Sequence, residues 1–250
     1  MPRRRLQDVS VALVAATLAA FVPAPPVAAL QLPAEARFSV EFRGIRVGEL
    51  VLRSRQSATG YAAAARLDSA GLAALIRPAR FEAEVQGRIR AGRLHPERYR
   101  EDVDTGRRAS HTELAYTGGV PDLRAGGPEG DDAAAPWRLD PAAQAGTVDP
   151  MTALLLLLAD VPPAAACRLD IALFDGRRRG RIALGDPLPA EGGLVCSGRY
   201  ARVAGYSDEE LAEGRLFAFR IVYRAGRDGL LRAAEIEADS LHGRARLVRR

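Results

Sequence analysis

The stretch Phe217-Ala218-Phe219-Arg220-Ile221-Val222-Tyr223 carries the clearest indication of the fold. Large apolar side chains stand at almost every second position, so one face of an extended chain is apolar. This period of two is typical of a strand with one buried face. The turn signal Asp228-Gly229 follows, and it returns the chain into a last extended segment that contains Ile236 and runs through His242-Gly243 to Leu247.

The same alternation recurs along the chain. It appears in segments 38–42, 50–52, 61–67, 81–89, 94–99, 114–116, 169–173, 182–184 and 199–202. Helical spacing over 68–76, ended by Pro78, predicts a short helical turn. Ser207 and Glu210 form a capping box for a second short helix, which ends at Gly214. We therefore expect a mainly β protein: a large curled antiparallel sheet, open barrel or sandwich-like, of about ten strands with two or three short helices.

The stretch Val148–Leu158, which reads VDPMTALLLLL, predicts one of these helices. Asp149 can cap a helix that begins at Pro150, and Pro162-Pro163 ends it. The apolar run is far shorter than the ~20 residues that cross a bilayer. A helix that is apolar nearly all round must be buried on most sides, so we expect it to pack in the concavity of the sheet.

The position of this helix bears on function. If it fills the concavity, little ligand space remains and binding of a partner is favoured; if it lies only at the mouth, it acts as a gate to a pocket. The residues that we expect either to contact a ligand or to plug the core are Leu154, Leu155, Leu157, Leu158, Phe217, Phe219 and Tyr223.

The first 29 residues are typical of a signal peptide. Arg3, Arg4 and Arg5 precede an apolar run from Val9 to Val22, and small residues allow cleavage near Ala29. The alternative is a retained membrane anchor, which the short run and Pro23 disfavour. We expect a periplasmic protein with one β domain over 30–250 and no transmembrane span after cleavage.

The formal charge of the chain is +5 and falls to about +3 once segment 1–29 and its three Arg and one Asp are removed. Acidic and basic residues are interspersed, and every basic residue is Arg. A nucleic-acid partner is disfavoured because its surface would require clustered basic stripes with aromatic residues.

Segment 118–146 differs in composition, being rich in Gly, Pro and Ala with the single Trp137. It predicts a flexible surface excursion rather than a folded unit. An extra hairpin within it is possible, but no core-forming pattern supports one.

Cys167 and Cys196 are the two cysteines of the chain. In an exported protein such a pair predicts a disulfide, which would contribute on the order of 3 kcal/mol by closing its loop. A redox or metal pair is the alternative, but the CxxC spacing typical of such pairs is absent.

Four local signatures occur in a characteristic order: Phe42–Glu49, Gly92–Tyr99, Val148–Pro150 with its leucines, and Phe174–Arg177. In this order they resemble the bacterial exported family called domain of unknown function 3108, over nearly all of the chain after the signal. The resemblance implies a cell-envelope protein of antiparallel β architecture. It implies no catalytic residues.

The residues themselves indicate no catalytic centre, metal site or cofactor. His95, His111 and His242 lack metal-ligand spacing, and no GxSxG motif is present. The run Arg177-Arg178-Arg179 is a candidate anion site, although a solvated hairpin turn is the favoured explanation.

Two functions follow. The first is a non-catalytic periplasmic protein whose curled sheet binds a hydrophobic or lipid-like ligand or an envelope partner. The alternative is a cell-envelope hydrolase acting on cell-wall or polysaccharide material, which would require carboxylates, or His with a carboxylate, to converge in a cleft.

Overall fold

A computed structural model describes residues 30–70, 79–106, 109–126, 134–240 and 243–250. Within these ranges thirteen strands form one antiparallel sheet in the order β7-β6-β5-β4-β3-β2-β1-β13-β12-β11-β10-β9-β8. The strands are β1 Glu35–Phe42, β2 Ile45–Gln56, β3 Gly60–Ser69, β4 Arg80–Arg90, β5 Arg93–Asp104, β6 Ala109–Thr117, β7 Val120–Ala125, β8 Asp170–Phe174, β9 Arg179–Ala190, β10 Gly193–Ala204, β11 Leu216–Ala225, β12 Leu231–Ser240 and β13 Gly243–Arg249.

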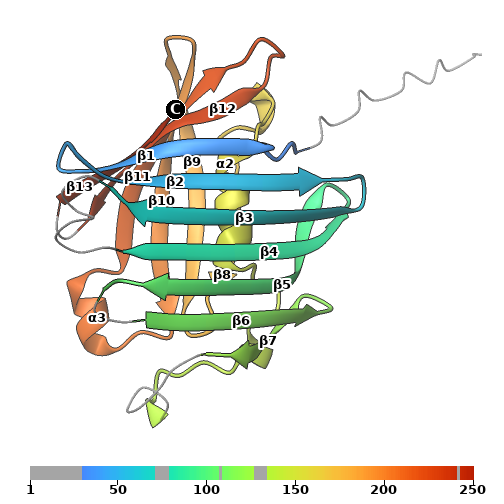
Figure 1. Ribbon diagram of the computed structural model, residues 1–250, viewed down its shortest axis with the longest axis vertical. Helices are drawn as coiled ribbons and strands as arrows, with labels where there is room; N and C mark the ends of the chain where they lie inside the picture. Colours follow the sequence, from blue (N-terminus) through green and yellow to red (C-terminus); the bar gives the residue numbers. More distant parts are fainter. Residues whose placement is uncertain (1–29, 71–78, 107–108, 127–133, 241–242) are drawn as a thin grey trace, which may run out of the picture.

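Neighbours in the sheet are neighbours in sequence, with one exception. β1 pairs with β13, so that Phe38 lies opposite Arg249. This pairing joins a half made of β1–β7 to a half made of β8–β13. Figure 1 shows the two halves crossing one another, with the helix between them. The expected curled antiparallel architecture is confirmed.

The helix between the halves is α2, Pro150–Leu158. It contacts β3, β4 and β5 on one side and β8 and β12 on the other. Leu155 and Leu158 are fully buried, as are Phe38, Phe174 and Ile221 from the surrounding strands. The helix therefore fills the concavity of the sheet, as its apolar sequence predicts.

Both ends of α2 are tied to other parts of the fold. The Asp149 carboxylate accepts a hydrogen bond from the backbone N–H of Thr152 at 2.8 Å, and Pro150 occupies the first turn. After the helix, the backbone of Asp160 pairs with Gln31, and that of Val161 pairs with Leu231. These contacts fix the position of the helix along the sheet.

The segment after α2 is fastened by the expected disulfide. Cys167 is bonded to Cys196 of β10, 29 residues away in sequence. The short helix α3, Asp208–Glu213, also forms as expected. Ser207 accepts from the Glu210 N–H, the Glu210 side chain accepts from the Ser207 N–H, and Gly214 ends the helix.

Three expectations differ from the structure. The sheet has thirteen strands, not about ten, partly because the last extended segment is two strands, β12 and β13. β3 continues through Asp68 to Ser69, where the sequence predicts the start of a helical turn over 68–76. Residues 71–76 of that predicted turn lie outside the described residues.

The third difference concerns the expected excursion, 118–146. It contains β7, which pairs with β6, and the 3-10 helix η2, Pro141–Ala143. The Gly, Pro and Ala content of this segment indicates a loop, but β7 is an edge strand, where the missing N–H of Pro121 is tolerated. A further 3-10 helix, η3, spans Pro163–Ala165.

Candidate functional site

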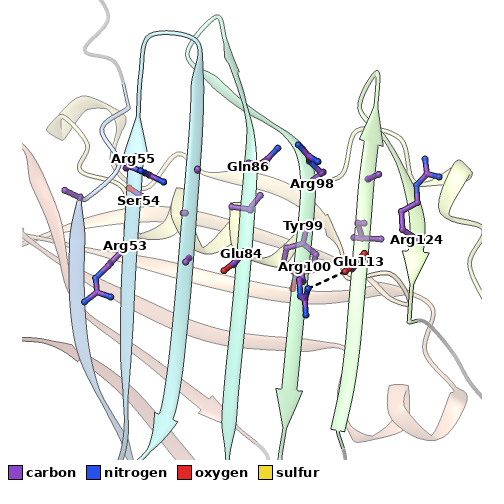
Figure 2. Close-up of a pocket in the computed structure, with 17 residues that line it drawn as sticks. Arg53, Ser54, Arg55, Glu84, Gln86, Arg98, Tyr99, Arg100, Glu113 and Arg124 are labelled. Carbon is purple, nitrogen blue, oxygen red and sulfur yellow. Dashed lines mark ion pairs between the residues drawn. The ribbon is translucent and has the colours of Figure 1, made fainter.

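A groove of about 820 Å³ lies on strands β2–β7, on the sheet face turned away from α2. We call it the outer groove. Its floor includes the small side chains of Ala62 and Ala64 on β3 and Ala115 on β6. Longer side chains from the flanking strands line it, including Arg53, Arg55, Glu84, Gln86, Arg98, Arg100, Glu113 and Arg124 (Figure 2).

The outer groove arises from the period of two in the strands. On β3, Tyr61, Ala63 and Ala65 face the core, which leaves Ala62 and Ala64 on the outer face. Because β2 and β4 carry long side chains at the positions opposite these alanines, a trough forms along β3. The volume of the groove lies in the range typical of ligand sites.

The charges of the outer groove are predominantly positive, with five arginines against two glutamates. Three of the arginines have carboxylate partners. Arg53 lies 3.1 Å from Glu35, and Arg124 lies 2.9 Å from Asp122. Arg100 lies 3.0 Å from Asp102. Hydrogen bonds from His111 and Arg100 hold the pKa of the Asp102 carboxyl below its ordinary value.

The two other arginines, Arg55 and Arg98, form no ion pair with any carboxylate in the described part of the chain. With the Gln86 amide oriented to match its neighbours, its oxygen accepts from Arg98 Nε at 2.8 Å and Nη2 at 2.7 Å. This neutral partner holds the Arg98 guanidinium in place without cancelling its charge. Arg55 and Arg98 are therefore the positive groups of the groove that are available to an anion.

A second, smaller depression of about 370 Å³ lies near the end of β4–β6 and contains His111. Its Nδ1 lies 2.7 Å from the Asp102 carboxylate, and its Nε2 lies 3.1 Å from that of Glu113. The imidazole ring therefore separates the two carboxylates, so the three groups do not converge on a common point. No set of three metal-ligating side chains within the described residues is arranged to hold an ion.

Polar residues also gather inside the sheet, at the start of α2. Asp149 is fully buried, and its second carboxylate oxygen accepts from the Thr152 hydroxyl at 2.7 Å. That hydroxyl is hydrogen-bonded to the Tyr61 hydroxyl at 2.9 Å. Burial raises the pKa of Asp149 to about 6 and raises that of Tyr61 above its ordinary range. These groups lie in the packed interior, so their hydrogen bonds are structural.

The apolar residues proposed as ligand contacts or core plug divide by burial. Leu155, Leu158 and Tyr223 are buried in the core, and the Tyr223 hydroxyl donates to the Leu157 carbonyl at 3.2 Å. Leu154, Leu157 and Phe219 are partly buried against that core. The Arg202 guanidinium lies over the ring of Phe217, with its central carbon 5.0 Å from the ring centroid.

The three arginines proposed as an anion site all contact neighbouring residues, Arg177 through its backbone N–H. Arg178 pairs with Glu210 and lies over the ring of Tyr206, and Arg179 donates to the Gln144 side chain at 3.2 Å. The Arg177 N–H donates to the Asp175 carboxylate at 2.9 Å. These residues thus hold α3 and the hairpin turn against the rest of the sheet.

Sequence reasoning missed the outer groove. The two arginines Arg53 and Arg55 of β2 and the run of alanines in β3 are visible in the sequence. However, Arg55 and Arg98 lie in one row because of the register of three successive hairpins, and a bulge between Gln86 and Gly87 shifts that register. A period-two analysis with explicit turn lengths could have aligned part of the row.

None of the helices in the described residues has the length and apolar character needed to cross a membrane. A comparison with curated proteins found no match. Among solved structures, the chain is similar to the crystal structure of a beta-barrel-like protein of domain of unknown function DUF1849 from Brucella abortus. The two share 16% identity with a TM-score of 0.48, and the similarity covers 89% of this chain and 98% of the other.

The sequence model of the family described as "Protein of unknown function (DUF3108)" matches residues 37–185. The matched region runs from β1 into β9 and includes the outer groove, α2 and the hairpin turn at Asp175. This match is shorter than expected, because the resemblance noted in the sequence extends over nearly all of the chain after the signal. It nevertheless spans more than half of the sequence, and the chain therefore belongs to the DUF3108 family.

Proposed function

We propose that this protein is a non-catalytic binding protein of the bacterial cell envelope, exported to the periplasm and using its outer groove to bind an envelope partner. The main support is the contrast between the two faces of the sheet. The inner face is filled by α2, with Leu155 and Leu158 fully buried. The outer face instead has an open groove in which Arg55 and Arg98 lack carboxylate partners within the described residues.

A hydrophobic or lipid-like ligand in the concavity is less well supported, because α2 occupies that space. Residues expected to contact such a ligand, including Leu155 and Tyr223, instead belong to the buried apolar core. Native mass spectrometry of protein purified without detergent should therefore show the mass of the polypeptide alone. A stoichiometric lipid adduct would restore the lipid-binding proposal.

Site-directed photocrosslinking tests the role of the outer groove. A photoreactive amino acid at the exposed position Ala64 should form a discrete adduct in an envelope preparation. The matched control is the exposed Ala218 on the outer face of β11, outside the groove. Identical adduct patterns at both positions would contradict binding through the groove.

Export is a separate part of the proposal, supported by the basic and apolar pattern of the first 29 residues. A fusion of residues 1–35 to a reporter that is active only outside the cytoplasm should give activity and a product cleaved near Ala29. Replacing Leu13 and Val14 by Arg should abolish both. An active reporter in the double variant would contradict export by this segment.

The hydrolase alternative is supported by one observation, the contact of His111 with Asp102 and Glu113 beside the smaller depression. The lowered pKa of Asp102 disfavours a role for it as a general acid near neutral pH. Cell-wall and polysaccharide substrates should therefore be left intact by the wild type. Cleavage that is lost in His111→Ala would favour the hydrolase.

A further inference from the structure

We infer that the outer groove recognises an extended acidic peptide segment of a partner protein, whose two carboxylates bind Arg55 and Arg98. This inference rests on the proposed function and names the chemistry of the partner. Arginine suits such recognition because its planar guanidinium can donate two parallel hydrogen bonds to one carboxylate.

The two arginines lie in one row across the sheet. The register places Arg55 opposite Ala62, Ala62 opposite Gln86, and Gln86 opposite Arg98. Three strand spacings separate the backbones of the two arginines, which corresponds to about 14 Å. Since Ala62 and Gln86 between them bear no charge, the row presents two separate positive groups, with a low floor at Ala62 and the Gln86 amide bound to Arg98.

An extended peptide matches this spacing. Side chains at positions i and i+4 project from the same face of an extended chain and are about 13 Å apart. A peptide lying across β2–β5 could therefore bring one carboxylate to each arginine. The intervening i+2 side chain would lie above the floor at Ala62, where there is space for it.

The neighbouring row of the groove explains why the peptide should follow this line. Arg53, Ala64, Glu84, Arg100 and Glu113 lie opposite one another in sequence along it. There Arg53 pairs with Glu35, and Arg100 with Asp102, while Glu84 and Glu113 add negative charge. An acidic peptide would be repelled from that row and attracted to the row of Arg55 and Arg98.

The lining of the groove favours a peptide over a sugar chain. Sugars present apolar C–H faces that stack on exposed aromatic rings. Among the described residues lining the groove, Tyr99 is the one aromatic residue, and it is 2% exposed because it faces the core. The floor of alanines instead leaves room for an extended chain with varied side chains.

Binding of a designed peptide tests this inference. The probe is a fluorescein-labelled dodecapeptide of Ser, Thr and Ala with Glu at positions 5 and 9, and its partner probe has Gln at both positions. Fluorescence anisotropy at low ionic strength should detect binding of the Glu peptide and at least tenfold weaker binding of the Gln peptide. Arg55→Gln and Arg98→Gln should each weaken binding of the Glu peptide about tenfold.

The matched control is Arg199→Gln. Arg199 is also exposed and lies between alanines, Ala183 and Ala218, but it belongs to β10, outside the groove. This variant should bind the Glu peptide as the wild type does. All three substituted side chains are on the surface, so circular dichroism melts should agree among the variants.

Several results would overturn the inference. Equal binding by the wild type and the Arg55 and Arg98 variants would show attraction by net charge alone. No binding of the peptide, with or without binding of an acidic oligosaccharide such as oligogalacturonate, would exclude an acidic peptide as the partner. In either case a position-specific crosslink at Ala64 would leave the proposed function intact. Absence of that crosslink would contradict both the inference and the proposed function.

Discussion

Asp149 is the residue on which the start of the central helix depends. Its carboxylate accepts from the backbone and hydroxyl of Thr152, and the same hydroxyl is hydrogen-bonded to Tyr61 of β3. The sequence predicts the cap, because Asp before Pro commonly begins a helix. The link to Tyr61, 91 residues away from Thr152 in sequence, depends on tertiary structure and could not be predicted.

The raised pKa of Asp149 predicts a pH dependence of stability. Burial raises this pKa from 3.8 to about 6, so the native state binds the proton more tightly than the unfolded state between these values. The contribution of Asp149 to the free energy of unfolding is therefore largest below pH ~4 and falls by about 3 kcal/mol as the pH rises above 6. Urea unfolding at pH 4.5 and 7.5 should detect about 2 kcal/mol of this change, because pH 4.5 already lies above the unfolded pKa of 3.8.

Asp149→Asn isolates the effect from other titrating groups. Asn keeps the capping oxygen but does not titrate, so the wild type should gain stability relative to this variant as the pH is lowered. Asp149→Ala removes the cap as well, so it should be about 1–2 kcal/mol less stable than Asp149→Asn at both pH values. A constant difference between the wild type and Asp149→Asn would show that burial of Asp149 does not control the pH dependence.

At the scale of elements, α2 and β7 show what sequence patterns can predict. The cap, the apolar run and the following prolines determine α2, and its position inside the sheet follows because it has no polar face. β7 was missed because Gly118, Gly119 and Pro121 indicate a loop. It forms because its partner β6 supplies the ladder and Pro121 sits on the free edge of the sheet.

Two leucines of α2 test whether the helix is the core. Leu155 is fully buried, whereas Leu156 is partly buried. Leu155→Ala should reduce the free energy of unfolding by about 3–5 kcal/mol, and Leu156→Ala should reduce it less. Leu155→Asp should prevent folding, since it buries an unpaired charge. Chemical denaturation followed by circular dichroism gives these values, and equal losses for both alanine variants would contradict the burial of Leu155.

The disulfide anchors the segment between α2 and β8 to β10. It closes a loop of 29 residues, for which chain entropy predicts a contribution of about 3–4 kcal/mol. Reduction of the wild type should lower its urea midpoint accordingly. The double variant Cys167→Ser/Cys196→Ser should unfold at the midpoint of the reduced protein and should not respond to reductant. A wild type that is insensitive to reductant would show that the bond adds no stability.

At the scale of the whole molecule, the two halves of the sheet meet at β1 and β13. Along this seam Arg246 lies 3.0 Å from Glu235 of β12 and 3.2 Å from Glu41 of β1. The alternation in both strands was visible in the sequence, but their pairing was not, because more than 200 residues separate the partners. Local periodicity identifies strands, whereas the order of distant strands in the sheet depends on how the core closes.

Removal of residues 243–250 tests this seam. Without β13, both β1 and β12 lose a hydrogen-bonded neighbour, so we expect cooperative unfolding to be lost. Arg246→Gln is the control, because it removes one side chain of the seam and leaves the hydrogen-bonded ladders of β13 in place. Thermal scans should show a sharp transition for the control and a broad one for the truncated chain. A sharp transition in both would mean that the halves are held together by α2 alone.

The pairing of β1 with β13 also determines the order in which the strands can pair during folding. β1 pairs with β2 through the first hairpin, but its other edge stays open until β13, the last described strand, reaches it. During that interval Phe38, Val40 and Phe42 lie on an open strand edge, which is the kind of edge that aggregates. We therefore expect closure of this seam to limit the rate of refolding.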